Sequence, residues 1–129
     1  MKREIIFRGK TEQGEWLYGY YMYNGKHLIV DTTKGALGFG KEVISETVGQ
    51  FTGLTDKNGK KIFEGDILQF IENPKFKEEV SFDDGAFGFY YKRTDSVIAF
   101  SDNEHGEDTE EYEVIGNVHD NKELLGENK

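Results

Sequence analysis

The chain has 129 residues, a mass of 14.8 kDa and a net charge of −9, from 16 Lys and Arg against 25 Asp and Glu. This length supports one hydrophobic core rather than two independent ones, since folding would bury about two-thirds of the surface. The charge argues against a general binder of nucleic acid or of anionic membranes, because either partner requires a surplus of Lys and Arg. The sequence contains no Cys, which excludes disulfides, thiolate metal sites and a Cys nucleophile, and agrees with a reducing compartment.

The N-terminal segment shows no targeting signal. Its apolar run, residues 5–7, ends at Arg8. A secretory signal needs about 7–15 apolar residues and a membrane helix needs about 20, and no such run occurs in the sequence. We therefore expect a cytoplasmic protein without a membrane partner.

The apolar residues of the first half alternate over short runs, which is typical of β-strands. The clearest run covers residues 15–23 and is followed by Asn24-Gly25, a turn that favours positive φ and predicts a hairpin into a strand at 27–31. Residues 56–59, Asp-Lys-Asn-Gly, predict a second hairpin of the same kind. Short helical turns are expected only at residues 41–47 and 120–126.

The second half continues the strand pattern. Residues 66–71 are apolar on both faces, as in a central strand. Further strands are expected within 80–91, over 97–100 and over 112–118, with Pro74 in a loop. Short strands at close spacing with little helix predict a mainly β protein, either a small barrel or a roll.

The acidic charge is concentrated in one segment. Residues 1–64 carry 10 basic and 8 acidic side chains, whereas residues 65–129 carry 6 and 17. Seven acids without Lys or Arg lie between residues 102 and 113: Asp102, Glu104, Glu107, Asp108, Glu110, Glu111 and Glu113. The spacing is similar to a calcium loop, but Glu107 stands where that loop requires Gly, and no helices flank it. We interpret the run as a solvated acidic loop.

No catalytic constellation is visible. Residues 35–42 match the phosphate-binding pattern G-x-x-x-x-G-K, but Glu42 replaces the hydroxyl that would hold Mg²⁺. His27, His105 and His119 stand too far apart to form a ligand pair. We therefore predict no enzyme activity, no cofactor and no specific metal site.

The aromatic residues of 16–23 are the candidates for an interaction surface. A strand places half of its side chains inward, so part of this cluster belongs to the core. Both faces of the run are aromatic, however, and Tyr and Trp are favoured at protein interfaces. The candidates are Trp16, Tyr18, Tyr20, Tyr21 and Tyr23, and self-association through them is left open.

Residues 47–68 read TVGQFTGLTDKNGKKIFEGDIL, which resembles the signature of the YopX family, small proteins of bacteriophages and prophages. Residues 6–10, 14–19 and 113–125 resemble the family in the same order, although Lys122 stands where relatives often have Pro. The resemblance implies one YopX-like domain over 1–129, with an N-terminal β subdomain (1–60) and a Src-homology-3-like barrel (61–129). It also implies a phage or prophage origin, and it brings no active-site residues.

Three functions follow as hypotheses. The first is a non-enzymatic module that binds a host or phage protein in the bacterial cytoplasm. The second is an acidic mimic of DNA that occupies the nucleic-acid site of a host protein, with no direct binding of nucleic acid. The third, ranked last, is a metal-dependent hydrolase built from the surplus carboxylates.

Overall fold

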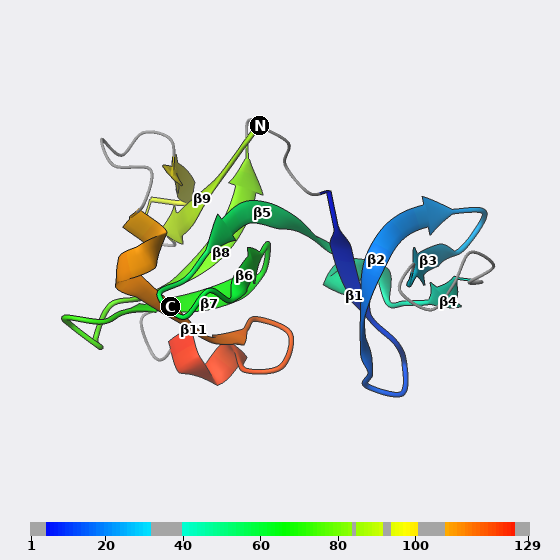
Figure 1. Ribbon diagram of the computed structural model, residues 1–129, viewed down its shortest axis with the longest axis horizontal. Helices are drawn as coiled ribbons and strands as arrows, with labels where there is room; N and C mark the ends of the chain where they lie inside the picture. Colours follow the sequence, from blue (N-terminus) through cyan, green and yellow to red (C-terminus); the bar gives the residue numbers. More distant parts are fainter. Residues whose placement is uncertain (1–4, 32–39, 84, 92–93, 101–107, 126–129) are drawn as a thin grey trace. The chain divides into compact units, whose positions relative to one another are not determined.

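The structure is a computed structural model that describes residues 5–31, 40–83, 85–91, 94–100 and 108–125. The chain divides into two compact units, Met1–Gly53 and Leu54–Lys129. This boundary lies within a strand, ahead of the division at residue 60 that the resemblance implies. Figure 1 shows the strands of both units along the chain.

The strands of the first unit belong to a six-stranded sheet with the order β4-β3-β2-β1-β5-β6, in which β4, β3, β2, β1 and β5 are antiparallel neighbours. A 3-10 helix, η2 (Ser45–Thr47), precedes β5, which continues into the second unit. Positive φ at Gly25, 97°, closes the predicted β2–β3 hairpin. The strands are β1 (Phe7–Lys10), β2 (Trp16–Tyr23), β3 (His27–Val30), β4 (Lys41–Glu42) and β5 (Gly49–Thr55).

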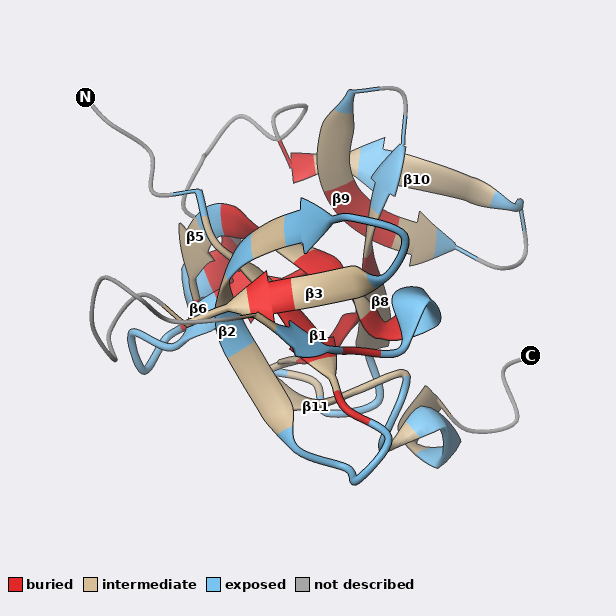
Figure 2. Cartoon of the chain, turned by 90° about the vertical axis from the view of Figure 1, so that its right-hand side faces the viewer, coloured by how far each residue is buried: buried red, intermediate tan, exposed pale blue. Residues whose placement is uncertain are grey.

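The core of the first unit lies on one face of this sheet. Ile29 of β3 and Val43 after β4 are almost completely buried, and Figure 2 shows the buried part of β3. Gly9 of β1 packs directly against Val43, where the methyl groups leave no room for a side chain. Burial of each such aliphatic side chain stabilises the fold by about 1.5–3 kcal/mol.

The second unit contains a five-stranded antiparallel sheet with the order β10-β9-β8-β7-β11. A bulge interrupts β11 between Val114 and Gly116. The 3-10 helices η4 (Asp108–Glu111) and η5 (Lys122–Leu125) flank β11. The strands are β6 (Lys61–Phe63), β7 (Asp66–Phe70), β8 (Lys77–Asp83), β9 (Ala86–Tyr91), β10 (Ser96–Ala99) and β11 (Tyr112–Asn117).

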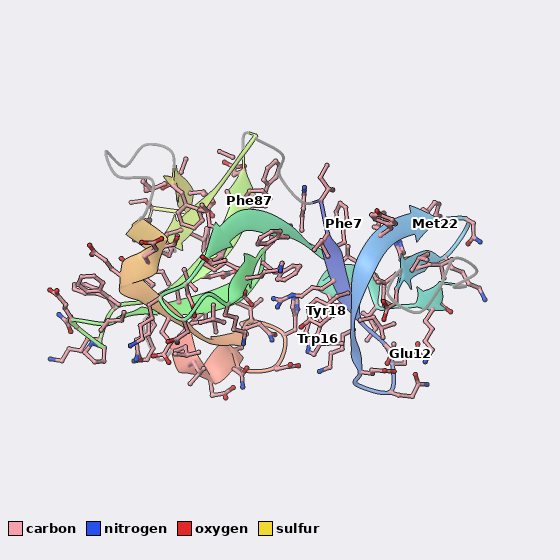
Figure 3. All side chains as sticks on the ribbon, viewed as in Figure 1. Phe7, Glu12, Trp16, Tyr18, Met22 and Phe87 are labelled. Carbon is pink, nitrogen blue, oxygen red and sulfur yellow. The ribbon has the colours of Figure 1, made fainter. Side chains whose placement is uncertain are left out.

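Apolar side chains from several strands form the core of this unit. Its buried members are Ile62, Leu68, Val80, Phe89 and Phe100, and Phe87 packs against them (Figure 3). The rings of Phe89 and Phe100 meet edge to face with centroids 5.0 Å apart. This geometry suits the charge distribution of aromatic rings and adds about 0.5–1.5 kcal/mol to the burial of their surface.

The mainly β fold predicted from the sequence is confirmed. The helices among the described residues are short 3-10 helices, and no described helix is long and apolar enough to span a membrane. In the described part of the chain, the pairings of the five-stranded sheet do not close it into a barrel, since β10 and β11 remain its two ends.

Candidate functional site

The signature segment contains a buried carboxylate, that of Asp56, which is only 3% exposed. Its Oδ1 accepts hydrogen bonds from the backbone N–H groups of Asn58 (2.8 Å) and Lys60 (2.9 Å). Its Oδ2 accepts one from the N–H of Val114 in β11 (2.9 Å). Burial raises the pKa of Asp56, but these three hydrogen bonds and the charge of Lys60 outweigh that effect and lower the pKa below its ordinary value of 3.8.

A second carboxylate of the signature, Asp66, is also buried, with 1% of its surface exposed. Its Oδ2 accepts a hydrogen bond of 2.7 Å from the N–H of Phe63, which closes the turn between β6 and β7. The same turn is held to β8, because the N–H of Gly65 donates to the carbonyl oxygen of Val80. Both buried acids of the signature therefore stabilise the fold by binding backbone groups.

The exposed aromatic residues lie on β2. Tyr18, Tyr20 and Met22 occupy alternate positions on one face and are 47%, 59% and 49% exposed. Trp16 continues the same face and is half-buried. Figure 3 shows Trp16, Tyr18 and Met22 following one another along this strand. We call Trp16, Tyr18, Tyr20 and Met22 the tyrosine face.

Two cations of β1 support Trp16 at one end of the tyrosine face. The guanidinium carbon of Arg8 lies 4.8 Å from the centre of the Trp16 ring, and Nζ of Lys10 lies 6.0 Å from it. Arg8 is opposite Tyr18 in the β1–β2 register, and Lys10 is opposite Trp16. A cation over an aromatic ring is favourable by about 0.5–2 kcal/mol, so these contacts fix the orientation of the ring.

The other predicted aromatic residues point to the opposite side of β2. The hydroxyl of Tyr21 and Nδ1 of His27 are joined by a hydrogen bond of 2.6 Å. Tyr23 contacts the same histidine, with ring centres 5.0 Å apart, although the tyrosine is 63% exposed. The five predicted residues are thus divided between two faces, and Tyr21 has a structural role in the β2–β3 hairpin.

The acidic run falls only partly within the described residues. Glu110 and Glu111 are exposed at the end of η4, and Glu113 is half-buried in β11. In the same helix, Thr109 is buried and donates a hydrogen bond of 3.0 Å to the carbonyl oxygen of Thr55. Asp102, Glu104 and Glu107 lie outside the described residues, as does the side chain of Asp108.

Comparison with known proteins decides the family. The sequence model described as "YopX protein" matches residues 7–126. The chain belongs to the YopX family. No curated protein matches the sequence.

A solved structure shares the fold of this YopX-family chain over nearly its whole length. The crystal structure of protein EF1440 from Enterococcus faecalis is 28% identical in sequence and superimposes with a TM-score of 0.61. The alignment covers 96% of this chain and 99% of that one. The alignment therefore includes residues of both units.

The sequence patterns did not single out two half-buried acids of this YopX-family member. Burial raises the pKa of Glu78 and Glu79, both on β8. For Glu79 the nearby charge of Lys122 acts in the opposite direction, and that of Glu64 adds to the effect of burial. The alternation of β8 in the sequence shows that adjacent acids face opposite sides of the strand, but not that either is half-buried.

The remaining sequence motifs give no catalytic arrangement in the described part of this YopX protein. No group of three or more His, Asp or Glu within the described ranges could hold a metal ion. In the residues that resemble a phosphate-binding loop, Lys41 and Glu42 form β4, a strand rather than the start of a helix. Residues 35–39 of that motif and His105 lie outside the described ranges, whereas His119 is exposed.

Proposed function

We propose that this chain is a phage- or prophage-encoded accessory protein that acts as a non-enzymatic protein-interaction module in the bacterial cytoplasm. The observation that carries the proposal is the tyrosine face of β2. Trp16, whose ring is contacted by Arg8, lies on this face with three side chains that are each about half exposed. Together these side chains give a partner a large apolar contact area. Tyr offers this area at a low cost in side-chain entropy, and its hydroxyl can form hydrogen bonds at the rim.

The chemistry of the described residues favours binding over catalysis. The buried acids of the signature, Asp56 and Asp66, are committed to backbone N–H groups. The exposed side chains of β2 are aromatic rings and a thioether, which offer apolar contact area rather than carboxylates or imidazoles. Such side chains recognise apolar and planar groups on another protein.

The fold of the second unit supports the same proposal. We infer a Src-homology-3-like small barrel that is partly open. Strands β7, β8, β9 and β10 are consecutive antiparallel neighbours, and β11 returns after η4 to pair with the other side of β7. Small barrels of this kind commonly bind through loops and exposed strand surfaces.

Affinity capture from a bacterial host lysate, with variants of both faces of β2, tests the proposal. The double variant Tyr18→Ser/Tyr20→Ser removes the centre of the tyrosine face, and loss of a central aromatic pair typically weakens binding by about tenfold or more. Tyr23→Ser is the control, because Tyr23 is also exposed (63%) but lies on the other side of the same strand. We expect the double variant to lose a partner that wild type and Tyr23→Ser retain. Equal capture by all three proteins would contradict the proposal.

The acidic composition of the second unit supports one alternative. Residues 54–129 contain 9 basic and 19 acidic residues, and Glu110 and Glu111 are exposed. A mimic of DNA would present such charge to a basic host protein, and its affinity would fall steeply as salt screens the charges. A captured partner that elutes at moderate salt from wild type and binds Glu110→Gln/Glu111→Gln weakly would favour this function over the tyrosine face.

A further inference from the structure

The tripeptide Asn-Gly-Lys occurs at two places in the described chain, each time in the turn of a hairpin. Residues 24–26 connect β2 with β3 (Figure 1), and residues 58–60 belong to the turn between β5 and β6. Every residue of both copies is exposed. In each copy the Gly has positive φ, and apart from its chain neighbours no heavy atom lies within 4 Å of the position that its Cβ would take. The two copies therefore share their local sequence and their steric access.

An Asn that is followed by Gly can react with its own backbone. The main-chain nitrogen of Gly, once it has lost its proton to hydroxide, forms a bond to Cγ of Asn. The Cγ–Nδ2 bond then breaks, and the leaving nitrogen takes a proton from water and departs as ammonia. Water opens the resulting cyclic imide at either carbonyl group, which gives aspartate or isoaspartate. Gly favours this cyclisation because it has no side chain to hinder the necessary rotation.

Hydrogen bonds restrain the attacking nitrogen in the copy at residues 58–60. The N–H of Gly59 donates to the carbonyl oxygen of Asp56 (3.0 Å). The N–H groups of Asn58 and Lys60 donate to Oδ1 of the buried Asp56 carboxylate, at 2.8 and 2.9 Å. To reach Cγ of Asn58, the nitrogen of Gly59 must rotate out of this turn, so these hydrogen bonds oppose the reaction.

The turn between β2 and β3 has no comparable restraint. The N–H of Asn24 donates to the carbonyl oxygen of Lys26 over a longer distance, 3.2 Å. Within the part of the chain that the structure describes, no acceptor binds the N–H of Gly25. This exposed N–H is open to hydroxide, and its nitrogen can turn towards Cγ of Asn24 without losing a hydrogen bond of its own.

We propose that Asn24 is a site of spontaneous deamidation and that the turn of Asp56 protects the identical tripeptide at Asn58. Water is the co-reactant and ammonia is the product that leaves, so the modification needs no enzyme. The net change replaces the side-chain amide by a carboxylate, which adds a negative charge to the first unit. The reaction is independent of the function proposed for the tyrosine face.

The modification changes the end of the β2–β3 hairpin. Tyr23 and His27 are the last cross-strand partners before the turn. Isoaspartate at position 24 lengthens the main chain between them, because the chain then passes through Cγ. The new carboxylate also lies close in sequence to Lys26, whose Nζ is 3.9 Å from Oε1 of Glu42. We therefore expect faster amide exchange at the end of the hairpin in the modified chain.

Incubation of the folded chain in mildly alkaline buffer tests the proposal, because hydroxide promotes the attack by the Gly nitrogen. Digestion at intervals, followed by mass spectrometry, measures aspartate and isoaspartate at residues 24 and 58. We expect Asn24 to react roughly tenfold faster than Asn58 or more, since several turn hydrogen bonds oppose the reaction at Asn58. Equal rates, or a faster reaction at Asn58, would overturn the proposal.

The same measurement in guanidinium chloride provides the control for the flanking residues. Both copies read Asn-Gly-Lys, so their rates should become similar once the chain is unfolded. A difference that persists in the unfolded chain would come from Tyr23 and Lys57, the preceding residues, and would contradict protection by the fold.

Variants of the folded chain test the role of the Asp56 carboxylate. Asp56→Ala should accelerate the reaction at Asn58 and leave that at Asn24 unchanged, whereas exposed Asp83→Ala should alter neither rate. Asp56→Asn keeps one acceptor oxygen and should give an intermediate rate at Asn58. Circular dichroism in the same buffer verifies that each variant is folded. An unchanged rate at Asn58 in folded Asp56→Ala and Asp56→Asn would show that this carboxylate does not protect the turn.

Discussion

The carboxylate of Asp56 connects two backbone segments, its own hairpin turn and the distant strand β11. It binds two N–H groups of its own hairpin turn and the N–H of Val114, 58 residues later. A buried N–H that loses its acceptor costs about 1–3 kcal/mol. Asp56 therefore gives the most recognisable part of the sequence a structural role.

Substitution of Asp56 should lower the free energy of unfolding. We expect Asp56→Ala to cost about 3 kcal/mol, because three N–H groups lose their acceptor, and Asp56→Asn to cost less, because one acceptor oxygen remains. Urea unfolding followed by circular dichroism measures the effect, with exposed Asp83→Ala as control. A loss no larger than that of Asp83→Ala would show that water replaces the carboxylate without cost.

The stability that Asp56→Asn loses should depend on pH. The pKa of Asp56 is lower in the folded than in the unfolded chain, so its stabilisation is complete above the ordinary value of 3.8. It is lost as the pH falls through that value towards the folded pKa. The difference in stability between wild type and Asp56→Asn should therefore be constant near neutral pH and narrow in acid.

The sequence predicted some of the candidate site at this scale. The sequence predicted a strand over residues 15–23, and alternation along a strand puts Trp16, Tyr18, Tyr20 and Met22 on one side, as in the structure. The same pattern could not show which side is exposed, because both sides are aromatic. The support of Trp16 by Arg8 depends on the pairing of β1 with β2, a contact between strands that periodicity within one strand does not contain.

At the scale of strands, the β9–β10 contact depends on the lack of a side chain at Gly88. A Cβ at this position would collide with the carbonyl group of Ile98, a backbone atom that cannot rotate away. The two strands would have to separate or shift, and forced overpacking of this kind typically costs about 1–3 kcal/mol.

Gly88→Ala should therefore destabilise the second unit by about 2 kcal/mol. The loss is measured by thermal unfolding, and amide exchange should locate the earliest opening in β9 and β10. Ser96→Ala, in the neighbouring strand, is a control that adds no atoms against the backbone. If Gly88→Ala unfolds at the same temperature as wild type, β9 and β10 leave room for a Cβ at this position, and the contact between them does not depend on glycine.

Turns were the elements that sequence predicted best. Asn24-Gly25 and Asn58-Gly59 both end in a Gly with positive φ, 97° and 79°, and each closes the expected hairpin. A helical turn was expected over residues 41–47, but only residues 45–47 are helical (η2) and residues 41–42 form the strand β4. The helix η4 was not predicted, because an acidic run carries no periodicity. Whether a sheet closes depends on the twist and register of all its strands, which local patterns do not determine.

At the scale of the whole molecule, the two units differ strongly in net charge. Residues 1–53 carry 7 basic and 6 acidic side chains, whereas residues 54–129 carry 9 and 19. Like charges on one compact unit repel each other, and this repulsion lowers the stability of the folded state while it favours solubility.

Salt should consequently stabilise the isolated protein. Raising NaCl from about 10 mM to about 0.5 M shortens the screening length from about 30 Å to about 4 Å. We expect the melting temperature to rise by about 3 °C as repulsion within the second unit is screened. Differential scanning fluorimetry at constant pH measures the shift.

Removal of two of these charges provides the control for the salt effect. Glu110→Gln/Glu111→Gln neutralises two exposed acids at the end of η4 without touching the core. This variant should melt higher than wild type at low salt and gain less from NaCl, because less repulsion remains to be screened. A melting temperature that falls with NaCl, or an equal gain in both proteins, would show that pairing with Lys and Arg already compensates the acidic charge. The surface of the second unit would then carry no uncompensated negative charge for a basic partner to recognise. That result would remove the physical basis of the DNA-mimic alternative and would leave the proposal for the tyrosine face unaffected.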